Sequence, residues 1–141
     1  MEKIRVLYVK PMEEPQVIEI ANTLEVKQEL VGGPIEAVYP SEEDMIALVC
    51  NEEGKYDESA LPNRVLYDEE SGMPYDVVHG AFLITGLTED NFGSLDDKML
   101  QKYKEKFRYP EAVIMQNGRI IIYSANPKIP VRVFAARKEG A

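Results

Sequence analysis

The sequence predicts an α+β domain with a mainly antiparallel sheet, two helices and a C-terminal β-hairpin. Short runs rich in β-branched residues recur along the chain, which is typical of strands. Residues 23–31 and 95–107 combine a helix-start signal with apolar residues at helical spacing. Near the end, Asn117-Gly118, the favoured pair for a two-residue type I′ turn, separates two apolar runs. Strand-rich segments around two helices indicate the α+β class.

Several further segments alternate or run apolar between turn residues. In addition to the hairpin at 113–116 and 119–123, strands are predicted at residues 4–9, 16–20, 35–39, 45–50, 79–86 and 131–135. Residues 61–67 are too short and mixed in character to be assigned to an element. The strands and helices follow one another without a linker or repeat, so residues 1–141 are predicted to form one domain.

The two helices carry their own boundary signals. Asn22 or Thr23 caps the first helix, because Asn22 stands three residues before Glu25, which is the spacing of a capping box. Gly32 follows the last apolar residue and favours a C-terminal stop. Ser94 is the predicted cap of the second helix, whose apolar face includes residues at i, i+4, i+8 and i+12: Leu95, Met99, Tyr103 and Phe107.

The cysteine count and the hydropathy pattern favour a cytoplasmic protein. Cys50 is the single cysteine of the 141 residues, so no intrachain disulfide can form, whereas small secreted domains usually contain several. The N-terminal residues enter a strand pattern at once, unlike a signal peptide. No apolar stretch approaches the ~20 residues of a membrane span. We therefore expect neither export nor membrane insertion.

The charge is distributed unevenly along the chain. The net charge is −9, and residues 36–70 contain eleven acidic and two basic residues, while residues 101–141 contain nine basic and three acidic residues. An acidic body disfavours binding to duplex nucleic acid, whose phosphates require lysine and arginine. The acidic block predicts a docking face for a basic protein partner. Solvated acidic turns on a polarised surface are the alternative explanation.

Motifs for catalysis or cofactor binding do not emerge. The sequence contains no phosphate-binding glycine loop, dinucleotide fingerprint or nucleophile elbow, so neither a catalytic residue nor a cofactor is predicted. One histidine and one cysteine are too few for a transition-metal site, so no metal is expected. We interpret His79 as a hydrogen-bonded structural residue and Cys50 as a small buried hydrophobe.

Two polar segments beside apolar runs contain the candidate binding residues. These residues are Asn51, Glu52, Lys55, Asn63 and Arg64, and we expect them to lie in one neighbourhood, bonded to one another. Arg64 is one of two bases in the acidic block and has the geometry to clamp a carboxylate or phosphate. The alternative is that both segments provide turn chemistry and internal ion pairs.

The order of several motifs resembles the domain-of-unknown-function family 3846. The resemblance rests on residues 23–36, 49–55, 61–64, 80–86 and 90–95, followed by the helix to Phe107. It covers residues 1–107 as a family-like core, with 108–141 as a C-terminal extension. The resemblance implies an origin in phages, plasmids or genomes of Gram-positive bacteria, and it assigns no catalytic residue.

Three functional hypotheses follow. The first is a non-enzymatic binding or interaction module encoded by a mobile element. The second is an anti-defence inhibitor whose acidic surface imitates DNA phosphates and occupies a host nuclease or restriction subunit. The third is a small-ligand-binding protein or enzyme that uses Asn51, Glu52, Asn63 and Arg64.

Overall fold

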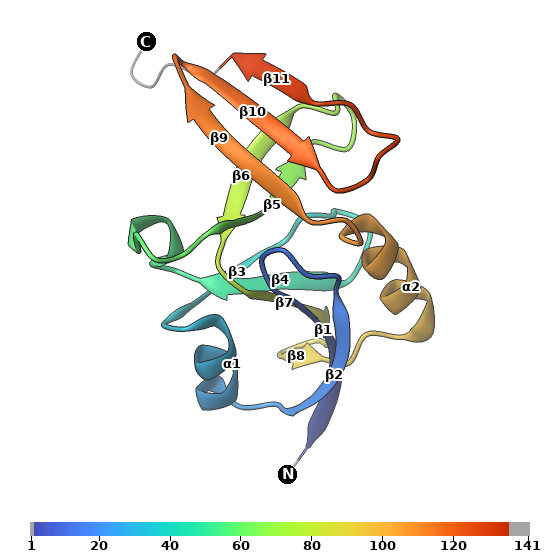
Figure 1. The fold of residues 1–141 in the computed structure, drawn as a ribbon. Coiled ribbons are helices and arrows are strands. Elements are labelled where there is room, and N and C mark those ends of the chain that lie inside the picture. The colour runs from blue at the N-terminus through green and yellow to red at the C-terminus, as the bar shows by residue number, and fades with distance from the viewer. Residues whose placement is uncertain (1, 136–141) are drawn as a thin grey trace.

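An antiparallel sheet forms the centre of the protein in a computed structural model that describes residues 2–135 (Figure 1). Its strands, in spatial order, are β2 (Gln16–Ala21), β1 (Lys3–Val9), β7 (Phe82–Leu87), β4 (Ile46–Asn51) and β3 (Ile35–Val38), and the short β8 (Phe92–Gly93) pairs with β7. Every pairing in the sheet is antiparallel. The predicted fold class is therefore confirmed.

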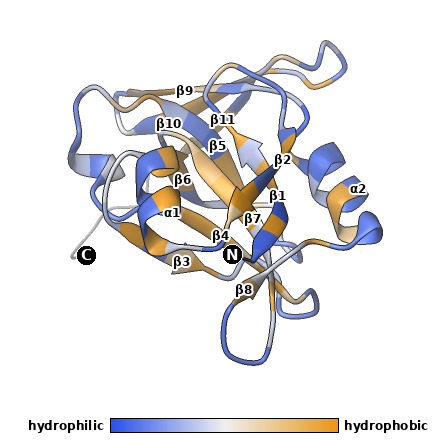
Figure 2. Ribbon diagram, turned by 90° about the horizontal axis from the view of Figure 1, so that it is seen from below, coloured by the Kyte–Doolittle hydropathy of each residue, from blue (hydrophilic) through white to orange (hydrophobic). Residues whose placement is uncertain are grey.

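Strand alternation divides the apolar side chains between two cores, one on each face of the sheet. On one face Ile4, Val6 and Leu83 pack with Val31 of helix α1 (Leu24–Val31). On the other, Leu7 and Val9 belong to a larger core that includes Tyr103 of α2 (Asp97–Lys106). Figure 2 shows the hydrophobic residues concentrated on central strands such as β4, whereas α2 carries both hydrophobic and hydrophilic residues.

Both helices begin close to their predicted starts, and Thr23, one of the two caps predicted for α1, is its cap. Thr23 caps α1, since its Oγ1 accepts from the Val26 amide at 3.2 Å. The prediction of Ser94 for α2 is wrong, because Asp96 accepts from the Met99 amide at 2.8 Å. The Ser94 hydroxyl instead accepts from the amide of Arg5 in β1 at 2.9 Å. None of the helices in residues 2–135 is long and apolar enough to span a membrane.

A second layer of two strands packs against the α2 face of the sheet. Residues 61–67, unassigned from sequence, form β5 (Pro62–Tyr67), which pairs with β6 (Pro74–His79). The predicted strand at 79–86 is wrong at its start, because His79 ends β6. Gly80 then turns the chain with a φ of +78° before β7 begins at Phe82. The side chains of Leu66 and Val78 join the core beneath the hairpin.

The C-terminal residues form a separate three-stranded sheet beyond this hairpin (Figure 1). The strands β9 (Glu111–Gln116) and β10 (Arg119–Ser124) make the predicted hairpin, and β11 (Arg132–Ala135) pairs with β10. Asn117 and Gly118 have φ values of +52° and +72°, as a type I′ turn requires. Residues 136–141 of the predicted extension lie outside the described residues.

Candidate functional site

Asn63 and Arg64, two of the five predicted binding residues, are completely buried in β5. The side-chain nitrogen of Asn63, Nδ2, donates to the carbonyl oxygens of Val9, at 3.0 Å, and Gly80, at 2.8 Å. Its Oδ1 accepts from Nη1 of Arg64 at 2.7 Å. Asn63 therefore holds β5 against β1 and against the turn that precedes β7.

Arg64 uses its whole guanidinium group inside the protein. Nε and Nη2 donate to the carbonyl oxygen of Phe107 at 3.0 and 2.9 Å, and Nη2 also donates to the carbonyl of Glu13 at 2.7 Å. Nη1 completes the set with the carbonyl and Oδ1 of Asn63. A guanidinium has five N–H donors, and these contacts engage all of them. Arg64 is thus a structural link rather than an exposed clamp for a carboxylate or phosphate.

The environment of Arg64 explains how a positive charge is accommodated there. Burial lowers the pKa of Arg64, and the nearby carboxylate of Glu111 opposes this shift. Phe107 is the C-cap of α2, where the helix dipole places partial negative charge. The positive guanidinium therefore interacts favourably with the negative end of the helix dipole and donates to carbonyl groups that would otherwise be unpaired. These bonds connect α2 to β5.

Asn51 closes the turn that follows β4. Its Oδ1 accepts from the amide of Glu53 at 2.8 Å, as in an Asx turn. The side-chain amide also lies against Gly33, where an added Cβ would stand 2.9 Å from Nδ2. Glycine at position 33 and asparagine at position 51 are therefore matched to each other across the end of the β3–β4 pair.

Asn51, Glu52 and Lys55 line one small cavity of about 220 Å³, and Asn63 and Arg64 are not among its lining residues. Lys55, in the 3₁₀ turn η1 (Gly54–Tyr56), forms an ion pair with Asp76 of β6. The hydrogen bond to Asp76 raises the pKa of Lys55. The structure thus brings three of the five predicted residues to one cavity and places the other two in the interior.

Cys50 and His79 also line this small cavity, and neither side chain is activated for a reaction there. Burial raises the pKa of the Cys50 thiol to about 11, and the charges of Glu36 and Asp76 act in the same direction. The His79 Nδ1 lies 3.3 Å from the carbonyl oxygen of Val77, where it donates because a carbonyl only accepts. The arrangement favours a protonated thiol and a structural histidine.

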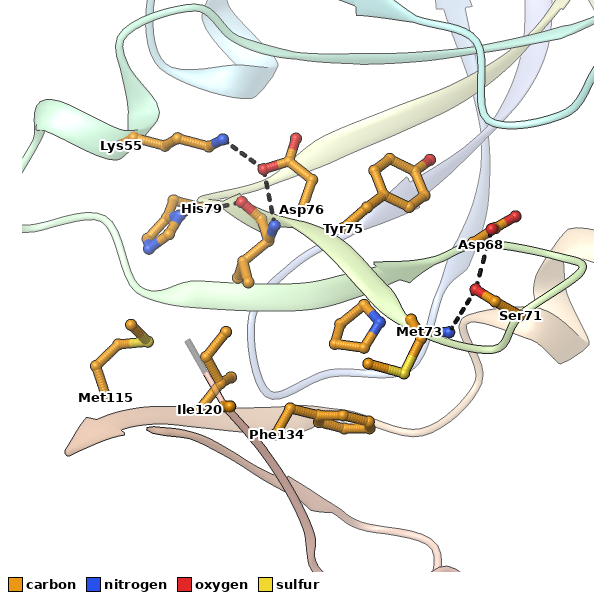
Figure 3. Close-up of a pocket in the computed structure, with 13 residues that line it drawn as sticks. Lys55, Asp68, Ser71, Met73, Tyr75, Asp76, His79, Met115, Ile120 and Phe134 are labelled. Atoms are coloured by element: carbon orange, nitrogen blue, oxygen red, sulfur yellow. Dashed lines mark hydrogen bonds and ion pairs between the residues drawn. The ribbon is translucent and has the colours of Figure 1, made fainter. Parts of the chain in front are cut away.

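A larger cavity of about 650 Å³, which we call the apolar cleft, lies between β6 and the C-terminal sheet (Figure 3). Met73, Tyr75 and Val77 belong to its wall on the β5–β6 side. Met115, Ile120 and Phe134 lie opposite on β9, β10 and β11, whereas the ring of Tyr75 points away from them. Lys55, Asp76 and His79 also line the cleft. The cleft and the small cavity therefore meet at Lys55, Asp76, Val77 and His79.

Sequence reasoning missed the apolar cleft because it missed β6. Residues 73–78 contain alternating and β-branched apolar residues, a signal that favours a strand, but Pro74 and the preceding turn weaken it. The other wall was predicted as a hairpin and a last strand at 131–135, without a packing partner. The contact between the two walls depends on Glu111, whose carboxylate accepts from the Val65 amide and the Tyr67 hydroxyl at 3.1 and 3.0 Å.

A third cavity, of about 700 Å³, is acidic, and we call it the acidic hollow. Its lining contains five carboxylates, those of Glu42, Glu43, Asp68, Glu69 and Glu70, and three tyrosines, Tyr39, Tyr67 and Tyr75. Partial burial raises the pKa of Tyr75, and the carboxylates of Asp76, Glu69 and Asp68 add to the shift. Asp68 and Tyr75 line both the acidic hollow and the apolar cleft, so the two cavities are neighbours that share these two residues.

The carboxylates of the acidic hollow do not form a metal centre. In residues 2–135, no group of three or more histidine, cysteine, aspartate or glutamate side chains is arranged to hold a metal ion. The lining instead combines dispersed negative charge with aromatic faces, and both attract organic cations. The acidic hollow is therefore suited to lysine or arginine side chains.

Comparison with protein families gives a match to the model described as Domain of unknown function (DUF3846), over residues 4–108. The chain belongs to this family. No curated protein and no solved structure matches the chain. The match ends just after α2, so the DUF3846 domain consists of the central sheet, both helices and the β5–β6 hairpin.

The two larger cavities relate differently to the DUF3846 domain. All residues that line the acidic hollow lie within it. The apolar cleft is composite, because Met115, Ile120 and Phe134 lie beyond residue 108. The C-terminal sheet therefore adds a wall to a surface that the DUF3846 domain already presents.

Proposed function

We propose that this DUF3846 protein is a non-enzymatic binding module of mobile-element origin that binds a basic protein partner. The binding surface consists of the apolar cleft and the acidic hollow together. The observation that carries the proposal is that they are neighbours, because Asp68 and Tyr75 line both cavities. The family resemblance supports the mobile-element origin, since it implies phages, plasmids and Gram-positive genomes as sources.

The side chains around the cavities favour binding over catalysis. Lys55 is neutralised by Asp76, the His79 Nδ1 is bonded to a main-chain carbonyl, and the pKa of Cys50 lies far above neutrality. A general base or nucleophile requires a free and suitably ionised group. Lys55, the His79 Nδ1 and the Cys50 thiol are instead paired or protonated.

The charge of the surface supports a basic partner. Lysine and arginine are absent from the residues that line the acidic hollow, which contains five carboxylates and three tyrosines. The guanidinium of Arg132 already lies 4.8 Å from the ring of one of these tyrosines, Tyr67. Cationic side chains gain from the negative field and from contact with tyrosine rings. Association with such a surface is fast at low ionic strength and slows as salt screens the charges.

A binding measurement with oligo-arginine as the probe tests the proposal. We expect Glu69→Lys/Glu70→Lys to weaken binding of the peptide about tenfold at low salt, since both charges line the acidic hollow. The matched control is Glu29→Lys/Glu89→Lys, which changes the net charge equally at two exposed positions elsewhere. Equal weakening in both variants would show a dependence on net charge alone and would contradict the proposal.

A further inference from the structure

The strand β6 has an edge with no partner strand. Within the described residues β6 pairs with β5 and with no other strand. Val77 stands opposite Val65, and the Val65 amide donates to Glu111 rather than across the hairpin. Opposed residues in an antiparallel ladder either exchange both hydrogen bonds or none. The amide and carbonyl groups of Val77 therefore point away from β5, toward the open edge.

Two side chains cover this edge through local contacts. Oδ1 of Asp76 accepts from the Val77 amide at 2.9 Å, and Nδ1 of His79 lies 3.3 Å from the Val77 carbonyl oxygen. Charged and polar side chains commonly protect open strand edges from pairing with other chains. Both side chains belong to β6 itself, so their rotation would break the ion pair of Asp76 with Lys55 but would leave the hairpin ladder intact.

The open edge at Val77 borders both the apolar cleft and the small cavity, and its amide points toward Asp76 and Lys55. Figure 3 shows Met115, Ile120 and Phe134 on the C-terminal sheet, opposite β6. Side chains along a strand alternate between two sides, so a strand laid beside β6 turns every second residue toward this apolar wall. The cleft thus offers main-chain pairing and apolar contacts along one line.

We propose that the basic partner contributes an extended segment that adds as a strand to the open edge of β6. Main-chain groups of this segment pair with the amide and carbonyl of Val77 in place of Asp76 and His79. Its alternate apolar residues fill the apolar cleft, and basic residues at one end reach the acidic hollow past Asp68 and Tyr75. The inference rests on the proposed function and adds the mode of recognition to it.

The charge and geometry of the cleft favour an extended basic peptide segment over other ligands that could fill an apolar cleft. The cleft adjoins the acidic hollow at Asp68 and Tyr75, which lie at the β5–β6 turn. An uncharged lipid tail or drug-like molecule would form no hydrogen bonds with the Val77 main-chain groups and would place no cation near the carboxylates. Strand addition gives main-chain affinity, and pockets for alternate side chains give specificity.

Selection of a linear peptide library displayed on phage against the full chain tests the inference. We expect the enriched peptides to combine alternating apolar residues with a basic end. With a synthetic enriched peptide, the Val77 amide should become more protected from hydrogen exchange than it is through its bond to Asp76, as main-chain pairing requires. Val77→Pro should weaken binding about tenfold or more, because it removes the amide, whereas the isosteric Val77→Thr retains the amide and most of the affinity.

Other outcomes overturn the inference. If enriched peptides are basic without an apolar pattern and leave the Val77 amide exchanging freely, strand addition fails while the proposed function stands on the oligo-arginine measurement. If no peptide is enriched, strand addition fails as well. A concentration-dependent dimer that protects Val77 without peptide would make a second copy the occupant. If Val77→Pro does not fold, as judged by circular dichroism, the exchange measurement on the unmodified chain decides.

Discussion

The carbonyl oxygen of Phe107 accepts two hydrogen bonds from the buried guanidinium of Arg64, from Nε at 3.0 Å and from Nη2 at 2.9 Å. This bond joins the end of α2 to β5 across 43 positions of the sequence. Through Nη2 the same guanidinium also reaches Glu13 in the turn between β1 and β2. One side chain therefore connects the helix, the hairpin and the central sheet.

Replacing this side chain should reduce stability sharply. Arg64→Met keeps an apolar stem but leaves the buried carbonyls of Phe107, Glu13 and Asn63 without donors. We expect the free energy of unfolding to fall by about 3 kcal/mol or more, measured by urea denaturation. The matched control is Arg119→Met at an exposed position of β10, which should change the value by less than about 0.5 kcal/mol. Similar losses in both variants would contradict the structural role of Arg64.

The contact between Gly33 and Asn51 predicts a coupling between two substitutions. Gly33→Ala places a Cβ 2.9 Å from Asn51 Nδ2 and 3.0 Å from Oδ1, so it should destabilise the protein. In an Asn51→Ala background the obstructing amide is gone, and the same change should be tolerated. A double-mutant cycle on unfolding free energies should give a coupling of about 1 kcal/mol. Additive effects would show that the two residues do not interact.

The pair of Asp44 and Tyr103 predicts a dependence of stability on pH. Hydrogen bonds from Lys102 and Tyr103, the latter at 2.7 Å, lower the pKa of Asp44. A carboxylate whose pKa is lower in the folded state stabilises the protein above its unfolded pKa of about 4, and this contribution is lost as pH falls through the folded pKa. The stability difference between the native protein and Asp44→Asn should therefore shrink below pH ~4.

Urea denaturation across this pH range provides the measurement, with Asp90→Asn as the control. Asp90 is an exposed aspartate in the turn before β8, so its substitution should give a difference that varies little with pH. A difference for Asp44→Asn that stays constant between neutral and acidic pH would show that the Asp44 contacts do not form in solution.

Cys50 should react slowly with alkylating reagents. Its pKa of about 11 leaves about 300-fold less thiolate at pH 7 than an ordinary cysteine with a pKa of about 8.5. Iodoacetamide labelling followed by mass spectrometry should be slow in the folded protein and should accelerate as pH rises toward 11. The protein in concentrated urea serves as the control and should react at the ordinary rate. Rapid labelling of the folded chain at neutral pH would exclude the raised pKa.

Features that depend on a few neighbouring residues were predictable from the sequence. The turn at Asn117-Gly118 requires two residues with positive φ, and this pair satisfies the requirement locally. The helix starts were found to within a few residues, but the caps were not resolved. Asn22 donates to the carbonyl of Phe92, 70 positions away, and Ser94 accepts from Arg5, 89 positions away. These distant partners decide which neighbouring residue is free to cap.

The candidate site was predicted less completely because burial of polar residues depends on tertiary contacts. Arg64, one of two bases in an acidic block, suggested either a clamp for an anion or internal ion pairs, and neither interpretation anticipated a fully buried guanidinium bonded to carbonyl groups. Its partners Glu13 and Phe107 lie 51 and 43 positions away, and no local pattern connects them. Lys55 and Asn51 do line a cavity, yet the partner Asp76 belongs to a strand that the sequence pattern did not indicate.

The C-terminal sheet places part of the proposed binding surface outside the region that matches the family. The open edge at Val77 belongs to the DUF3846 domain, whereas Ile120 and Phe134 lie outside the matched region. In a family member whose sequence after α2 differs from this one, the open edge of β6 will face a different wall or solvent. Partner choice can then diverge through exchange of the appended segment, while the inherited domain keeps its core unchanged. Grafting residues 109–135 onto such a relative should carry the apolar preference of this chain with it.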